Sequence, residues 1–204
     1  MGAEFELPDE KLVSLSRNGD LDAFNRLVER YQSAVFGLCF RLLGRREAAE
    51  DATQEAFLSA YRALSRFDGG NVRSWLLRIA ANESKDELRR RYRKDAPHSL
   101  DAPAGAEAIV RDIPDTREGA EQSAERSELH RIIEGALATL PFDQRQALVL
   151  VDLYEYRYEE AAEMTGVTLG TIKSRIHRAR ERLRAVLVAN PELLAGYRRL
   201  DGGE

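Results

Sequence analysis

Apolar residues recur with a helical period along most of the chain, and the clearest case lies between residues 169 and 184. One stripe at i, i+3, i+7, i+10 and i+14 spacing is formed by Leu169, Ile172, Ile176, Ala179 and Leu183. At about 100° per residue, Ser174, His177 and Arg178 fall opposite this stripe, with Thr171, Lys173 and Arg175 on its flanks. The pattern predicts an amphipathic helix with a polar and cationic outer face.

The residues before this helix favour a helix-turn-helix. A second helical segment begins near Tyr158, Gly166 suits a tight turn, and Thr168 suits the N-cap of the following helix. Small and cationic residues on the second helix would permit close approach to a major groove. The alternative is a basic amphipathic helix whose charges are only solvated.

The other segments are also helical, and no convincing period-2 strand is present. We expect helices near 9–17, from an Asp20 cap to about Gly44, over 46–64 and over 72–94. Further helices are expected from about 123 to 140 and over 144–154, the latter with a capping box of Asp143 and Gln146. The predicted fold class is all-α.

The composition divides the chain into two small helical domains. Between residues 96 and 125, Pro and Gly interrupt the helical pattern and acids outnumber arginines, which predicts a flexible acidic linker. The predicted domains are 1–95 and 126–190, followed by a tail over 191–204.

Bulk properties restrict the function class. The chain is 43% hydrophobic and 32% charged, without an apolar run of transmembrane length (about 20 residues) or a basic N-terminal leader, which predicts a cytoplasmic protein with no membrane insertion. Cys39 is expected to be a buried structural thiol. The three histidines are scattered and no catalytic or metal-ligand motif appears, so we expect no enzyme, no metal and no cofactor.

The net charge of −4 is unusual for a protein that binds DNA alone. The basic residues cluster locally, over 85–94 and 173–184, on an otherwise acidic chain. We infer weak autonomous DNA binding and a protein partner that supplies the remaining affinity.

Two further surfaces fall in the first domain. One stripe of the predicted 46–64 helix carries Asp51, Gln54, Glu55 and Leu58, and could dock a basic partner helix or be an ordinary solvated face. The loop 66–73 and the helix after it combine aromatics with cations and amides, as single-stranded bases require. The alternatives there are core packing of Phe67 and Trp75, favoured for Trp75, and a solvated basic helix end.

At these residues the chain resembles a known family. The motifs D-A-T-Q-E-A-F (51–57), F-D-x4-R-S-W-L-x2-I-A-x-N-x3-D-x2-R (67–89), L-P-x3-R-Q (140–146) and Y-E-E-A-A-E-x2-G-V-x3-T-I-K-S-R-I-H-R-A-R (158–180) occur in order. Together they resemble bacterial RNA polymerase sigma factors of the extracytoplasmic-function type, over about residues 20–95 and 128–188.

The resemblance implies a promoter-specificity subunit that binds core RNA polymerase (β′ and β subunits) and drives promoter melting. The implied polymerase-binding residues are Asp51, Gln54, Glu55 and Leu58. The implied contacts to single-stranded DNA at the −10 element are Phe67, Asn71, Arg73, Asn82, Asp86, Arg89, Arg90 and Arg93. The implied contacts to double-stranded DNA at the −35 element are Thr168, Thr171, Lys173, Ser174, Arg175, His177 and Arg178.

The resemblance also implies regulation by an anti-sigma factor, and leaves the linker either threading toward the polymerase active-site cleft or acting as a plain spacer. The promoter sequence is not implied, because 68–71 and His177 fall at variable positions of the family. A stand-alone helix-turn-helix regulator that acts as a dimer is the rival interpretation.

Overall fold

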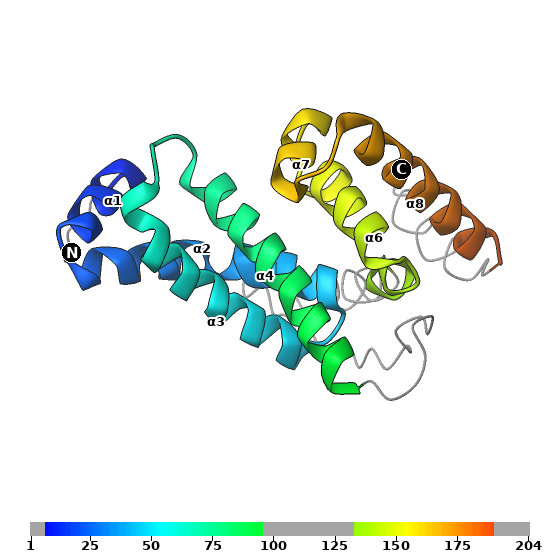
Figure 1. The fold of residues 1–204 in the computed structure, drawn as a ribbon, viewed down its shortest axis with the longest axis horizontal. Coiled ribbons are helices and arrows are strands. Elements are labelled where there is room, and N and C mark those ends of the chain that lie inside the picture. The colour runs from blue at the N-terminus through cyan, green and yellow to red at the C-terminus, as the bar shows by residue number, and fades with distance from the viewer. Residues whose placement is uncertain (1–6, 96–132, 190–204) are drawn as a thin grey trace, which may run out of the picture. The chain divides into compact units, whose positions relative to one another are not determined.

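The computed structural model describes residues 7–95 and 133–189, and within these ranges the chain is helical and contains no strand (Figure 1). The described residues group into two compact units. The first comprises residues up to 94 except 41–45, and the second comprises 41–45 and the residues from 95 onward. The predicted all-α class is confirmed for the described residues. The predicted linker over 96–125 and the tail over 191–204 lie outside them.

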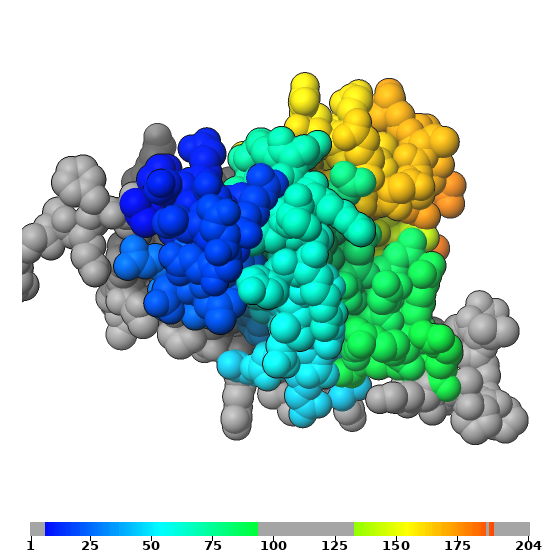
Figure 2. Space-filling view, turned by 60° about the vertical axis from the view of Figure 1, so that its left-hand side comes forward, coloured from blue at the N-terminus to red at the C-terminus, as the bar shows by residue number. Residues whose placement is uncertain are grey.

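The first unit contains four α-helices, whose bounds follow the sequence pattern closely. They are α1 (Asp9–Arg17), α2 (Leu21–Leu43), α3 (Arg46–Ala63) and α4 (Val72–Asp95), with a 3₁₀ turn η1 (Leu64–Arg66) after α3. The predicted Asp20 cap of α2 is confirmed, because the Asp20 Oδ1 accepts a 3.0 Å hydrogen bond from the Ala23 amide. In the space-filling view, α3 (cyan) lies between the N-terminal residues (blue) and α4 (green) (Figure 2).

Alanines let α3 sit within this bundle. Its buried face consists mainly of small side chains, namely Ala48, Ala49, Ala52, Ala56, Phe57 and Ala60. Small residues allow close approach of helix backbones, while larger side chains of the neighbouring helices, such as Leu38 and Leu77, fill the core. The opposite, polar face of α3 is therefore presented to solvent.

Polar contacts join α1 to α2. The Asp9 carboxylate accepts hydrogen bonds from Arg30 and from the Tyr31 hydroxyl. Burial, together with the hydrogen bond to Asp9, raises the pKa of Tyr31 to about 12. In the core of the same unit, Cys39 is fully buried and burial raises the pKa of its thiol, as expected of a structural cysteine.

The second unit is built from short helices. Residues 133–138 are helical, and α6 (Phe142–Leu148), the π-helical turn η2 (Val149–Leu153), α7 (Tyr158–Thr165) and α8 (Leu169–Ala189) follow. Both α6 and α7 pack against α8. None of the helices in the described residues combines the length and hydrophobicity that a bilayer-spanning segment needs.

The predicted helix over 144–154 is wrong in two respects. It starts earlier, with Pro141 at the N-cap, so Asp143 lies in the first turn and the capping box of Asp143 and Gln146 does not form. It also changes to π-helical hydrogen bonding at Val149, where the Tyr154 amide donates to the Val149 carbonyl. The carboxylate of Asp143 is thereby left for a partner on another helix.

The turn between η2 and α7 contains a strained residue. Glu155 has φ +59°, and among the described residues it is the one non-glycine position with positive φ. A residue with a Cβ atom adopts this left-handed conformation at a cost of roughly 1–2 kcal/mol. Amide hydrogen bonds from Tyr154 to Val149 and from Tyr156 to Leu150 hold the turn around it.

We predict that Glu155→Gly raises the free energy of unfolding by about 0.5–1 kcal/mol, because glycine removes the Cβ clash at some cost in unfolded-state entropy. Urea denaturation followed by circular dichroism measures the change. Glu155→Ala is the control, since it removes the carboxylate but keeps the Cβ atom. Equal stabilisation by both substitutions would show that charge, and not backbone strain, governs this position.

Candidate functional site

The polar face of α8 is presented as the sequence predicts. Ile172, Ile176 and Ala179 are buried against the other helices of the second unit, and Leu169 and Leu183 are half-buried beside them. The predicted contacts divide by exposure: Thr168, Lys173, His177 and Arg178 are exposed, whereas Thr171, Ser174 and Arg175 are half-buried. The structure thus brings all seven to one helix and its cap but does not expose them equally.

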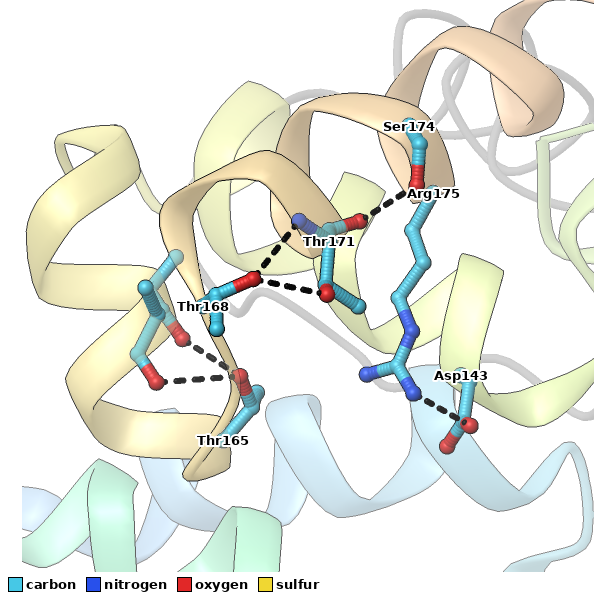
Figure 3. A network of polar contacts seen from close by, with 8 residues as sticks. Asp143, Thr165, Thr168, Thr171, Ser174 and Arg175 are labelled. Carbon is cyan, nitrogen blue, oxygen red and sulfur yellow. Dashed lines mark hydrogen bonds and ion pairs between the residues drawn. The ribbon is translucent and has the colours of Figure 1, made fainter.

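Hydrogen bonds fix the first turns of α8 (Figure 3). The Thr168 Oγ1 accepts from the Thr171 amide at 3.2 Å, which confirms the predicted N-cap, and lies 2.9 Å from the Thr171 Oγ1. The Ser174 hydroxyl donates to the Thr171 carbonyl at 2.9 Å. Gly166, at φ +68°, ends α7 in the left-handed conformation, as the predicted tight turn requires. The turn and cap together set where α8 begins.

Two arginines of α8 are held by carboxylates of the second unit. The Arg175 Nη2 lies 2.7 Å from the Asp143 Oδ2, and Figure 3 shows this side chain extending from α8 to the start of α6. The Arg180 guanidinium makes a bidentate contact with Asp152, at 3.1 Å from Nε and 2.7 Å from Nη2. These hydrogen bonds to Asp152 raise the pKa of Arg180. Neither carboxylate was singled out as a site residue by the sequence.

The outer side of α3 carries the residues predicted to bind polymerase. Asp51 and Gln54 are exposed, Glu55 is half-buried, and the Leu58 side chain is 42% exposed. Gln54 and Leu58 belong to a larger feature that the sequence did not indicate, an apolar groove of ≈ 350 Å³ between α2 and α3. Its lining residues are Leu21, Phe24, Val28, Gln54, Phe57, Leu58 and Tyr61.

The groove contains apolar side chains that remain open to solvent. Leu21 is 58% exposed and Tyr61 is 41% exposed, and the Tyr61 ring packs edge-on against Phe24 at 5.0 Å. Exposed apolar groups that line a groove with polar residues at its edge are typical of a protein-binding surface. The outer side of α3 is thus both apolar and acidic, since Asp51 and Glu55 belong to the same helix.

The structure buries one of the predicted DNA contacts, Phe67. The Phe67 ring is 6% exposed and packs against Trp75 with centroids 4.8 Å apart, so it belongs to the core and cannot stack on a base in this conformation. Trp75 is half-buried, in agreement with its predicted packing role. Asn71 is exposed and caps α4, because its Oδ1 accepts a 2.9 Å bond from the Ser74 amide. Arg73 is exposed beside it.

The other predicted −10 residues lie along α4. Asn82, Asp86, Arg89, Arg90 and Arg93 are all exposed. Acids neutralise part of this surface: Arg89 pairs with Asp86 at 3.3 Å. The largely buried Glu87 carboxylate contacts Arg90 at 3.3 Å and Arg91 at 2.6 Å. The basic run therefore carries less unpaired positive charge than its composition indicates.

Comparison with known proteins identifies the family of the chain. Residues 27–94 match the family described as Sigma-70 region 2, and residues 130–183 match Sigma-70, region 4. The chain is 38% identical to the ECF RNA polymerase sigma-E factor of Haemophilus influenzae, over 86% of this chain and 93% of that protein. It is 35% identical to the ECF RNA polymerase sigma factor SigW of Bacillus subtilis, over 89% and 98%.

A solved structure shows the same likeness. The sigma factor RpoE of Bartonella quintana, determined in complex with the anti-sigma factor NepR, has a TM-score of 0.57 and 26% identity, over 82% of this chain and 98% of that one. The two family matches fall on the two helical units that carry the surfaces described above. The chain therefore belongs to the ECF RNA polymerase sigma factors and is a promoter-specificity subunit of that polymerase.

Proposed function

We propose that the two units of this sigma factor divide the work of initiation. The groove and acidic residues of α3 bind core polymerase, the exposed side of α4 and its preceding loop hold unpaired −10 bases, and α8 reads the −35 element as duplex. The observation that carries the proposal is the polar face of α8, opposite the buried side chains of Ile172, Ile176 and Ala179. No catalytic step is assigned to the chain.

The proposed −35 contacts differ in how exposed their side chains are. Lys173 and Arg178 are exposed and, among the described residues, have no ion-pair partner, while His177 lies 3.5 Å from Glu181. Such side chains reach phosphates and guanine edges in a major groove. The hydroxyls of Thr168, Thr171 and Ser174 take part in the hydrogen bonds of the first turns. Their small side chains would let the helix approach the DNA closely, but they are too short to reach distant groups.

The proposed −10 contacts differ in whether an acid pairs with them. Asn82 and Arg93 are exposed and have no acid partner within the described part of the chain, while Arg89 and Arg90 share their charge with Asp86 and Glu87. Amide and guanidinium groups can read the edges of unpaired bases. Phe67 is buried and packs against the half-buried Trp75, so this pair would support the loop that carries Asn71 and Arg73 rather than contact bases directly.

The groove between α2 and α3 could also bind a second protein, a regulator that competes with polymerase. Its exposed Leu21, Leu58 and Tyr61 would be covered when the sigma factor binds polymerase. A regulator of the anti-sigma type could compete for the same apolar residues and so hold the protein inactive, which is how we account for an anti-sigma partner.

In vitro transcription with core polymerase on a genomic library tests the function as a whole. We expect initiation at a discrete set of start sites that share two upstream elements. Initiation nowhere, with protein shown free of any copurified regulator, would reject the proposal. A homodimer in native mass spectrometry that shifts DNA without polymerase would support a stand-alone regulator instead.

We predict that Leu58→Asp weakens binding to core polymerase by tenfold or more (about 1.5 kcal/mol), because it places a charge in the apolar groove. Fluorescence anisotropy of labelled full-length protein measures the dissociation constant. Val188→Asp is the matched control, since Val188 is also exposed but lies near the end of α8. Unchanged binding in the Leu58 variant would place the docking surface elsewhere.

We predict that Arg178→Ala lowers holoenzyme affinity for mapped promoters by about tenfold and reduces the salt dependence by about one phosphate contact. Arg184→Ala removes the same charge from an exposed position of α8 nearer its C-terminal end, beyond the part of a recognition helix that contacts bases, and is the control. Equal effects of the two substitutions would indicate nonspecific attraction and not readout by the polar face.

We predict that Asn82→Ala slows promoter opening about fivefold while leaving duplex binding unchanged, because a hydrogen bond to an unpaired base is lost. Permanganate reactivity of unpaired thymines at a mapped promoter reports the opening. Asn25→Ala, an exposed asparagine on α2, is the control. Loss of duplex binding in the Asn82 variant would contradict the proposed division between melting and recognition.

A further inference from the structure

The cations of α8 fall into two groups that the sequence does not distinguish. Lys173 and Arg178 are exposed and have no acid partner among the described residues. Arg175 and Arg180 are each joined to a carboxylate outside α8. The first group is arranged to meet DNA, and the second requires another explanation.

The Arg175 pair is the more enclosed of the two. The Arg175 side chain is 18% exposed, and its Nη2 lies 2.7 Å from Asp143 at the start of α6. Asp143 is available for this contact because α6 begins two residues earlier than a capping box would require. Arg180 is more open, at 54% exposed, but its contact with Asp152 is bidentate and therefore fixes the plane of the guanidinium.

Asp152 lies in the π-helical turn that follows the helix carrying Asp143. In an uninterrupted α-helix, Asp143 and Asp152 would lie about 180° apart around the axis, on opposite faces. The i→i+5 hydrogen bond from Tyr154 to Val149 widens the last turn and reduces the rotation per residue, which narrows this angle. The two carboxylates contact arginines that lie five residues apart on α8.

We propose that Asp143 and Asp152 are positioning residues for promoter recognition: they hold Arg175 and Arg180 so that α8 is fixed at two points along α6 and η2. The two arginines orient the recognition helix and are not DNA contacts. This inference rests on the proposed −35 function of α8, and it assigns Arg175 a different role from the one that the family resemblance implies.

The geometry favours orientation over phosphate contact. To reach a phosphate, Arg175 would have to leave a half-buried carboxylate, which would then remain unpaired beside an anionic ligand. The buried stripe limits the rotation of α8, and the turn at Gly166 and the Thr168 cap set where the helix begins. The two ion pairs to the α6–η2 segment add directional contacts further along the helix, at Arg175 and Arg180.

The first test uses the free full-length protein and does not depend on polymerase. We expect the amides of 171–180 to exchange with solvent at least fivefold faster in Asp143→Ala than in the wild-type protein, because α8 is less firmly held. Glu163→Gln, which neutralises an exposed acid of α7, is the control and should leave exchange unchanged. Unchanged exchange in both Asp143→Ala and Asp143→Asn would overturn the proposal.

The second test uses the holoenzyme on a mapped promoter and on the same fragment with a scrambled −35 element. We expect Asp143→Ala and Arg175→Ala each to reduce the ratio of the two affinities by about tenfold, and the double variant to reduce it no further than either alone. The slope of log affinity against log salt concentration, measured on the scrambled fragment, should not change in Arg175→Ala. Loss of a phosphate contact would lower the magnitude of this slope by about one.

One pattern of affinities would reject the positioning role. If Arg175 contacts DNA and Asp143 competes for it, Asp143→Ala raises affinity for the promoter while Arg175→Ala lowers it, and the positioning role is rejected. A wild-type holoenzyme that binds the mapped promoter and the fragment with the scrambled −35 element equally well rejects the −35 function instead. In that case the hydrogen-exchange result still decides whether the ion pairs hold α8.

Discussion

The burial of one apolar stripe of α8 determines most of what this protein can present to DNA. Ile172, Ile176 and Ala179 are essentially inaccessible in the second unit, so the rotation of α8 about its own axis is set by packing. Every polar residue of the helix then has a fixed direction, either outward or toward α6. The α3 helix follows the same rule in the first unit, because its alanine face is buried and leaves Asp51, Gln54 and Leu58 outward. In both units the functional surface is what remains once the core is filled.

Much of this was predictable, because helical period and capping depend on short-range sequence. The bounds of α1 to α4, the Asp20 and Thr168 caps and the exposed face of α8 all agree with the pattern. What the pattern could not give depends on tertiary contact. Asp143 has the spacing of a capping residue, yet the helix starts at Phe142 and its carboxylate binds Arg175. The Phe67 ring, the groove between α2 and α3 and the π-helical turn likewise depend on which helices become neighbours, and no local period encodes that.

Charge pairing changes the meaning of the basic segments. The sequence has two cationic clusters on a chain of net charge −4, but acids within the same unit engage many of their arginines. Asp86 and Glu87 engage Arg89, Arg90 and Arg91 on α4, and Asp143 and Asp152 engage two more on α8. Long-range attraction to DNA scales with unpaired charge, so it is weaker than the count of arginines suggests. Affinity must then come from polymerase, which fixes two modest contact points at one spacing and makes the second effectively intramolecular.

Weak nonspecific attraction is an advantage for a specificity subunit. A genome presents a vast excess of competing sites, so occupancy of a promoter depends on the ratio of specific to nonspecific affinity and not on affinity alone. An arginine held by a carboxylate adds little to nonspecific binding, but it still orders the helix that carries the base-reading groups. In the arrangement proposed above, Lys173 and Arg178 act from a fixed helix, and the polar face of α8 discriminates sequences with few contacts. On α4, the largely buried Glu87 likewise pairs with two arginines, while Asn82, a proposed −10 contact, is exposed. Arginines paired with carboxylates, together with a few exposed side chains that contact bases, therefore favour sequence-selective DNA binding by an acidic protein.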